Sequence, residues 1–165
     1  MKLETGDILL KKGNNPLSWV ISEVTDSPYT HAGIVYSDPI AVESFMYGVE
    51  PVSIQNLKPA DVYRLKGSIG TGLIKAQKME IIDECKKAIE RDIGYDYLQL
   101  ITYAYYAVFG GVNKFNNPRK YICTEFVDRV YKRLNIDLVG DRPLGDITPK
   151  DLGESKLLTK VVEIN

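Results

Sequence analysis

Residues 118–134 read PRKYICTEFVDRVYKRL, and this stretch decides the fold of the chain. Its apolar residues recur at three- and four-residue spacing, which predicts an amphipathic helix with polar residues on the other face. The apolar members are Phe126, Val127, Val130, Tyr131 and Leu134, and the polar members are Glu125, Asp128, Arg129, Lys132 and Arg133. The segment before Cys123 is short and follows Pro118, so the helix is expected to begin within about one residue of Cys123.

A cysteine at the start of a helix has the setting that a nucleophile needs. The first backbone N–H groups of a helix are unpaired and the helix dipole is positive there, so a thiolate is stabilised and the thiol pKa falls. The plainer alternative is that Cys123 is a small buried residue, as free cysteines commonly are. Its position does not decide between the two, so the residues around it must.

The length and composition are those of an ordinary globular protein. We expect a single domain over residues 1–165, which is long enough to bury a core. Hydrophobic residues make up 44% of the chain and charged residues 26%, and the net charge is −1. Basic and acidic residues are mixed along the chain, which argues against nucleic acid as the main partner.

The cysteine and histidine content argues against a disulfide framework and a zinc site. Cys85, Cys123 and a single histidine cannot supply the usual zinc ligands, so we expect no metal and no other cofactor. The N-terminal segment MKLETGDILLKKG has too short an apolar run for a signal peptide, and no stretch is as long as a transmembrane helix. These features predict a cytoplasmic protein with no integral membrane segment, and they leave the oligomeric state open.

The second informative stretch is SPYTHAGIVY, residues 27–36. After the Ser-Pro turn, residues 32–36 predict a buried strand with His31 where that strand begins. A turn then leads to a second predicted strand over residues 40–45. The two strands are expected to pair as an antiparallel hairpin.

The hairpin gives a geometric test. If Tyr36 pairs with Ile40, His31 lies opposite Phe45 and diagonal to Glu43, and all three share one face. Diagonal neighbours have Cβ atoms roughly 7–8 Å apart, a gap that a glutamate spans to reach an imidazole. A register shifted by one residue would put Glu43 on the opposite face, so the expectation depends on the register.

His31 is the only histidine, and therefore the only imidazole available as a general base. A lone histidine is often structural, and Glu43 taken alone has the alternative of a surface carboxylate on an edge strand. The catalytic interpretation gains from the combination of the two with a cysteine that begins a helix elsewhere in the chain.

The order of these motifs resembles that of a known family. GDILL, THAGIVY, AVES and finally YICTEFVDRVY follow one another as in the permuted members of the NlpC/P60 papain-like superfamily, the YiiX/YebB-like cysteine hydrolases. In that group the histidine strand comes first and the cysteine helix last. The similarity extends to GYDY at residues 94–97 and ITPKDL at residues 147–152. One departure is Thr124-Glu125, where unpermuted members usually have Ser-Gly.

The resemblance implies an α+β, circularly permuted papain-like (NlpC/P60-type) fold, with a small, mostly antiparallel sheet packed against helices. It also implies Cys123 as nucleophile, His31 as base and Glu43 as the third polar residue. The implied function is a thiol hydrolase that cleaves amide bonds of a small peptide or a murein-type isopeptide. One alternative is a lipid-directed acyltransferase or thioesterase, favoured by an apolar groove at residues 103–109. Another is a catalytically silent binding module, favoured if Cys123 is buried or His31 points away from it.

In such a site the backbone N–H of Cys123 is a natural donor to the oxyanion, and Tyr29 and Tyr121 are both candidates for the second donor.

The rest of the chain predicts helices and strands around the hairpin. One predicted helix runs from Lys75 to Ile93, and its apolar stripe consists of Met79, Ile82, Cys85, Ile89 and Ile93. A second runs from Tyr97 to Phe109, a short one is capped by Thr148 and begins at Pro149, and another short one starts at Pro16. The further predicted strands are residues 6–10, 62–65 and 159–164.

Overall fold

The computed structural model describes residues 2–13, 27–45, 48–67, 72–91, 94–95, 120–140, 142 and 147–165. The described elements, in chain order, are β1 (Ile8–Lys12), β2 (Tyr29–Ser37), β3 (Ile40–Phe45), β4 (Gly48–Ser53), the 3-10 helix η1 (Ile54–Leu57), β5 (Ala60–Leu65), α2 (Lys75–Glu90), β6 (Gly94–Tyr95), β7 (Lys120–Tyr121), α4 (Cys123–Arg133), α5 (Pro149–Gly153) and β8 (Leu158–Ile164). The helices predicted at Pro16 and over Tyr97 to Phe109, and the groove at residues 103–109, lie outside the described residues.

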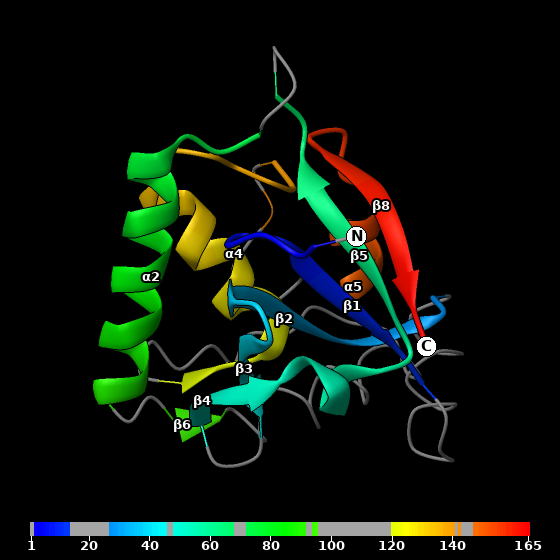
Figure 1. The fold of residues 1–165 in the computed structure, drawn as a ribbon, viewed down its shortest axis with the longest axis horizontal. Helices are drawn as coiled ribbons and strands as arrows, with labels where there is room; N and C mark the ends of the chain where they lie inside the picture. Colours follow the sequence, from blue (N-terminus) through cyan, green and yellow to red (C-terminus); the bar gives the residue numbers. More distant parts are fainter. Residues whose placement is uncertain are drawn as a thin grey trace.

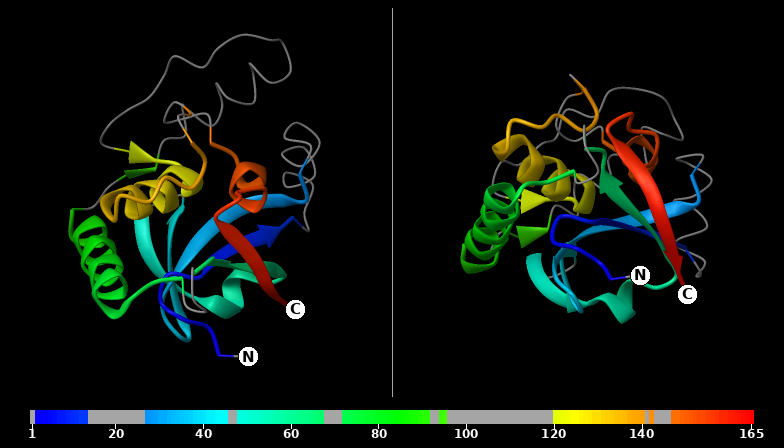
Figure 2. Two further views of the ribbon diagram at one scale, coloured as in Figure 1. Left: turned by 90° about the horizontal axis from the view of Figure 1, so that it is seen from above. Right: turned by 45° about the horizontal axis from the view of Figure 1, so that its top comes forward.

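A six-stranded sheet forms the centre of the fold, in the order β4-β3-β2-β1-β5-β8. Every neighbouring pair in it is antiparallel. Helices α2 and α4 lie side by side at one end of the sheet, and α5 lies near β8 (Figures 1 and 2). The α+β class with a mostly antiparallel sheet is therefore confirmed. Within the described part of the chain, no helix is long and apolar enough to cross a membrane.

Both faces of the sheet bury apolar side chains. On the helix side, Ile8, Ala32 and Ile34 of the strands form one cluster with side chains of α2, α4 and α5. On the other side, Leu9 and Val35 form a second cluster with the N-terminal segment and η1. Because successive strand residues point to opposite faces, the run of apolar residues in β1 serves both clusters at once.

The hairpin of β2 and β3 has the predicted register. Gly33 pairs with Glu43 and Val35 with Ala41, and this spacing continued places His31 across from Phe45. The turn end differs, because a bulge pairs Ser37 with Ile40 in place of Tyr36. A bulge adds one residue to one strand and leaves the pairing beyond it intact, so Glu43 keeps its place diagonal to His31.

Helix α2 begins at Lys75 as predicted and ends at Glu90, and the predicted stripe is buried only in part, at Cys85 and, less fully, at Ile89. Ile81, Cys85 and Ala88 are buried, whereas Met79 is 62% exposed. Ile81 packs against the N-terminal turn, where its Cδ1 would lie 3.0 Å from a Cβ built on Gly6. Tertiary contact therefore selects one of two adjacent apolar rows, a choice that helical periodicity leaves open.

Strand β4 was not predicted. It is an edge strand of the sheet, paired only with β3 among the described strands, and it contains the exposed Pro51. Proline has no N–H to give to a ladder, so it is tolerated on an edge, and it weakens the sequence signal for a strand.

The predicted polar face of α4 is buried at Glu125 and Asp128, which are both 0% exposed. The carboxylate of Asp128 forms an ion pair with Lys132 at 2.9 Å. The chain after α4 folds back against it, and its Leu138 and Ile147 belong to the same buried cluster. The helix is thus covered on more than one side, which its own periodicity does not indicate.

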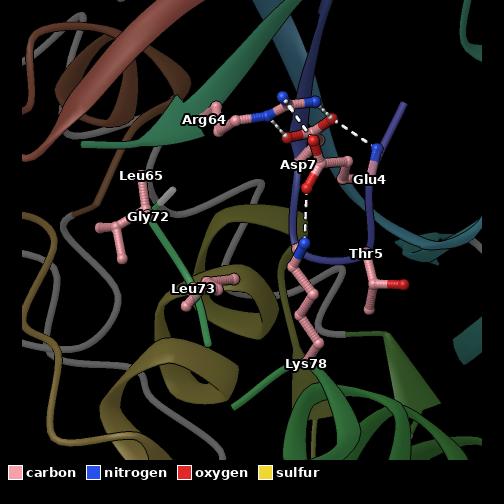
Figure 3. A pocket seen from close by; sticks show the side chains of 9 residues that line it. Glu4, Thr5, Asp7, Arg64, Leu65, Gly72, Leu73 and Lys78 are labelled. Atoms are coloured by element: carbon pink, nitrogen blue, oxygen red, sulfur yellow. Dashed lines mark hydrogen bonds and ion pairs between the residues drawn. The ribbon is translucent and has the colours of Figure 1, made fainter. Parts of the chain in front are cut away.

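A cluster of four charged residues fixes the N-terminal segment to the sheet and to α2. Figure 3 shows it in the wall of a small pocket, where Arg64 donates to Asp7 from Nε and Nη2, both at 2.7 Å. Arg64 also donates to Glu4, and Glu4 in turn pairs with Lys78 of α2. Each charge in this wall has an opposite partner, so we interpret the pocket as a structural junction.

Replacement of Arg64 by methionine is expected to destabilise the protein by about 3 kcal/mol, because it leaves the Asp7 carboxylate buried without its partner. Asp7 is 1% exposed. Urea unfolding followed by circular dichroism measures the loss. Lys86→Met, at an exposed position of α2, serves as the control and should change stability by no more than about 0.5 kcal/mol. Equal losses in the two variants would contradict the structural role of the pair.

Candidate active site

The predicted start of the cysteine helix is confirmed. Helix α4 begins at Cys123, with Ile122 as the N-cap residue in an extended conformation. The N–H of Ile122 donates to the Glu125 carboxylate at 3.3 Å, which closes the first turn back on itself. A carboxylate in the first turn also complements the helix dipole. The first turn of α4 is therefore fixed, and the thiol projects from its first residue.

The strands bring His31 and Glu43 together as the register requires. His31 Nε2 donates to Glu43 Oε2 at 2.6 Å, and both side chains are about one-tenth exposed. The ring of Phe45 meets the imidazole edge-on, with centroids 5.4 Å apart and planes at 76°. The imidazole is thus held by a carboxylate at one nitrogen and by an aromatic ring against its side.

The thiol of Cys123 meets the same imidazole. His31 forms a side-chain hydrogen bond with Cys123, and since Nε2 is occupied by Glu43, Nδ1 is the ring nitrogen that faces the sulfur. Backbone N–H groups of Ala32 and Thr124 also donate to the sulfur. The ladder of β2 with β3 begins at Gly33, the residue after Ala32.

The electrostatics of the site favour a thiolate and an imidazolium. Burial raises the pKa of the Cys123 thiol, but the charge of His31 and the hydrogen bonds from His31, Ala32 and Thr124 together hold that pKa below its usual value. Burial opposes the charged imidazole, yet the Cys123 thiolate and Glu43 raise the pKa of His31 to about 10. The two groups stabilise each other's charge, so the pair favours thiolate with imidazolium over thiol with neutral imidazole.

Cys85 has the opposite environment. It lies in α2 with none of its surface exposed, and burial raises the pKa of its thiol to about 12. Its interpretation as a core residue agrees with that burial. The two cysteines of the chain therefore differ in ionisation, and only Cys123 has a cationic neighbour.

Other residues of the site had weaker sequence signals. The hydroxyl of Thr124 donates to the backbone oxygen of Ile147 at 2.6 Å and ties the first turn of α4 to the segment before α5. The hydroxyl of Tyr29 is bonded to Asp61 at 2.6 Å and to Tyr63 at 3.0 Å, so it is not directed at the thiol. The side chain of Tyr121, the other candidate for an oxyanion donor, lies outside the described residues. The sequence shows a threonine directly after Cys123, but it gives no sign that the backbone oxygen of Ile147 accepts its hydrogen bond.

The fold and the site define an α+β protein in which a cysteine that begins a helix faces a histidine and a carboxylate. No protein-family model matches the sequence, and no curated protein does. The fold is similar to a solved structure, the metalloprotein YiiX from Escherichia coli O157:H7, DUF1105. The TM-score is 0.73 and the sequence identity 18%, over 99% of each chain. The likeness establishes a YiiX-like fold.

A metal ion does not fit the residues described here. Nowhere among them do three or more histidine, cysteine, aspartate or glutamate side chains converge as ligands would. Both nitrogens of the one histidine are already engaged, Nε2 by Glu43 and the other by Cys123. A metal ligand needs a free nitrogen lone pair, so we derive no step through a metal.

Limiting iodoacetamide at neutral pH is expected to alkylate Cys123 and leave Cys85 unmodified, because the pKa of the Cys123 thiol is lowered whereas burial raises that of Cys85. Peptide mapping by mass spectrometry identifies the labelled cysteine. A Cys85→Ala variant is the control and should react at the wild-type rate. Preferential labelling of Cys85 would refute the assignment of Cys123 as the reactive thiol.

Glu43→Gln is expected to raise the thiol pKa of Cys123. The amide oxygen of glutamine still accepts the hydrogen bond from His31, but it carries no charge, so the imidazolium loses its proton at a lower pH. The Cys123 thiolate then has no cation beside it, and the pKa of the thiol rises. Titration of the thiolate by its ultraviolet absorbance measures the shift. Glu50→Gln removes the same charge from the paired position on β4 and should leave the titration unchanged. An unchanged pKa in both variants would make Glu43 a bystander.

Proposed function

We propose that this protein is a thiol hydrolase of the permuted NlpC/P60 papain-like type, which cleaves amide bonds of a peptide or a murein-type isopeptide. The observation that carries the proposal is the single imidazole that bonds Glu43 at 2.6 Å and Cys123 at the same time. A nucleophile, a base and a residue that orients the base are the groups that acyl transfer needs. The order of the motifs in the sequence supports the same superfamily.

The proposed reaction has two halves. In the first, the Cys123 thiolate adds to the carbonyl carbon; the bond to the leaving nitrogen then breaks, and that nitrogen takes the proton of the His31 imidazolium. In the second, neutral His31 takes a proton from water, and the resulting hydroxide attacks the thioester. The carbon–sulfur bond breaks, the acid leaves, and the thiolate and imidazolium are restored.

The developing oxyanion needs donors on the side of the carbonyl away from the leaving group. The backbone N–H of Cys123 is well suited, because the first N–H groups of a helix have no partner within it. The positive end of the helix dipole adds to the stabilisation. Tyr29 is the weaker of the two tyrosine candidates for a second donor, because Asp61 and Tyr63 hold its hydroxyl.

A second candidate is the catalytically silent binding module. One observation favours it, since Cys123 is only 7% exposed and a substrate carbonyl has to reach its sulfur. The pairing of His31 with Cys123 favours the enzyme, because a binding module has no need of a thiolate beside a cation. Alkylation at neutral pH separates the two, since a sulfur that a small reagent cannot reach would not serve an enzyme.

His31→Ala is expected to lower the rate of Cys123-dependent acyl transfer by about 10²–10⁴-fold and to leave the fold intact, because the general base is lost while the sheet is retained. Hydrolysis of S-ethyl thioacetate, followed by chromatography of the released thiol, measures the rate. Cys123→Ala sets the background. Circular dichroism of His31→Ala is the control, and an unfolded variant would support a structural histidine in place of a catalytic one.

A further inference from the structure

Phe45 is the one large apolar side chain that joins the site to solvent among the described residues. It ends β3, two residues after Glu43, and its ring lies against the His31 imidazole at 5.4 Å. Phe45 is 42% exposed, whereas His31, Glu43 and Cys123 are each less than 9% exposed. A single exposed apolar side chain is ordinary in itself; what sets Phe45 apart from the other exposed apolar side chains that are described is its contact with the buried imidazole.

The side of the substrate that meets Phe45 follows from the roles of the imidazole. His31 delivers its proton to the leaving atom, so the leaving atom must lie within hydrogen-bond reach of the ring nitrogen that faces Cys123. The remainder of the leaving group then extends from that atom over the imidazole, away from the acyl carbon held by the sulfur. Phe45 is in contact with that same imidazole, so a leaving group that extends over the ring comes within reach of its aromatic surface.

We infer that Phe45 is a specificity-determining residue that binds an apolar substituent on the leaving group of the substrate. This inference rests on the proposed function, since it assigns a direction to the substrate in the same site. Contact with the ring removes apolar surface of both partners from water, and an aromatic face adds geometric preference. A leaving group with an alkyl or aromatic substituent is the class that this surface fits.

A series of thioesters tests the direction of the substrate. S-ethyl and S-hexyl thioacetate differ only in the apolar length of the leaving thiol, and S-ethyl hexanethioate carries the same extra length on the acyl side. The quantity to measure is kcat/KM, because it reports the acylation step in which the leaving group departs. Wild type is expected to prefer S-hexyl over S-ethyl thioacetate.

Phe45→Ala is expected to reduce that preference about 10-fold, because several methylene groups lose their apolar contact. Phe45→Leu keeps apolar bulk and should retain most of the preference. Leu157→Ala is the matched control: Leu157 is also 42% exposed but precedes β8 at the far edge of the sheet, so the preference should stay at the wild-type value.

Three results would overturn the inference. If Phe45→Ala slows both thioacetates equally, Phe45 only holds the imidazole. If the loss falls on S-ethyl hexanethioate, Phe45 contacts the acyl side. If the preference is unchanged, Phe45 does not contact the substrate. Failure of the proposed function is distinguishable from these, because thioester cleavage would then be absent or would persist in Cys123→Ala.

Discussion

The pairing of β2 with β3 in one register is the constraint on which the rest of the site depends. It puts Glu43 diagonal to His31 on a shared face, where the carboxylate reaches Nε2 at 2.6 Å. A shift of one residue would send Glu43 through the sheet to the other face and leave the imidazole unsupported. The same register sets Phe45 against the ring, so one geometric choice fixes the orientation of the imidazole and the surface beside it.

Burial makes this arrangement both costly and effective. A buried carboxylate, imidazolium and thiolate each lose hydration, and each alone would shift to its neutral form. Together they satisfy one another, and the backbone N–H groups of Ala32 and Thr124 complete the shell around the sulfur. In such a low-dielectric setting the loss of any member acts on the others, so the three groups form one electrostatic unit.

Much of the fold near the site follows from local pattern. The start of α4 at Cys123 and the extent of β3 are confirmed. Turn residues that include a proline precede both elements, and the spacing of the apolar residues then becomes that of a helix or of a strand. What failed depends on contacts distant in sequence: the burial of Glu125 and Asp128 comes from the segment after α4, and the face of α2 is chosen by the N-terminal turn. The three candidate site residues were named from their types and positions, and the structure brings them together. The donors to the sulfur are backbone groups, which carry no sequence signal.

The order of the elements has a consequence for synthesis on the ribosome. The hairpin that carries His31 and Glu43 is synthesised long before Cys123, and the thiol meets the imidazole only when α4 docks on the sheet. Until that helix docks, the cysteine keeps the low nucleophilicity of a free thiol in an unfolded chain. The lowered thiol pKa is therefore a property of the assembled fold, and the nascent chain carries an ordinary cysteine.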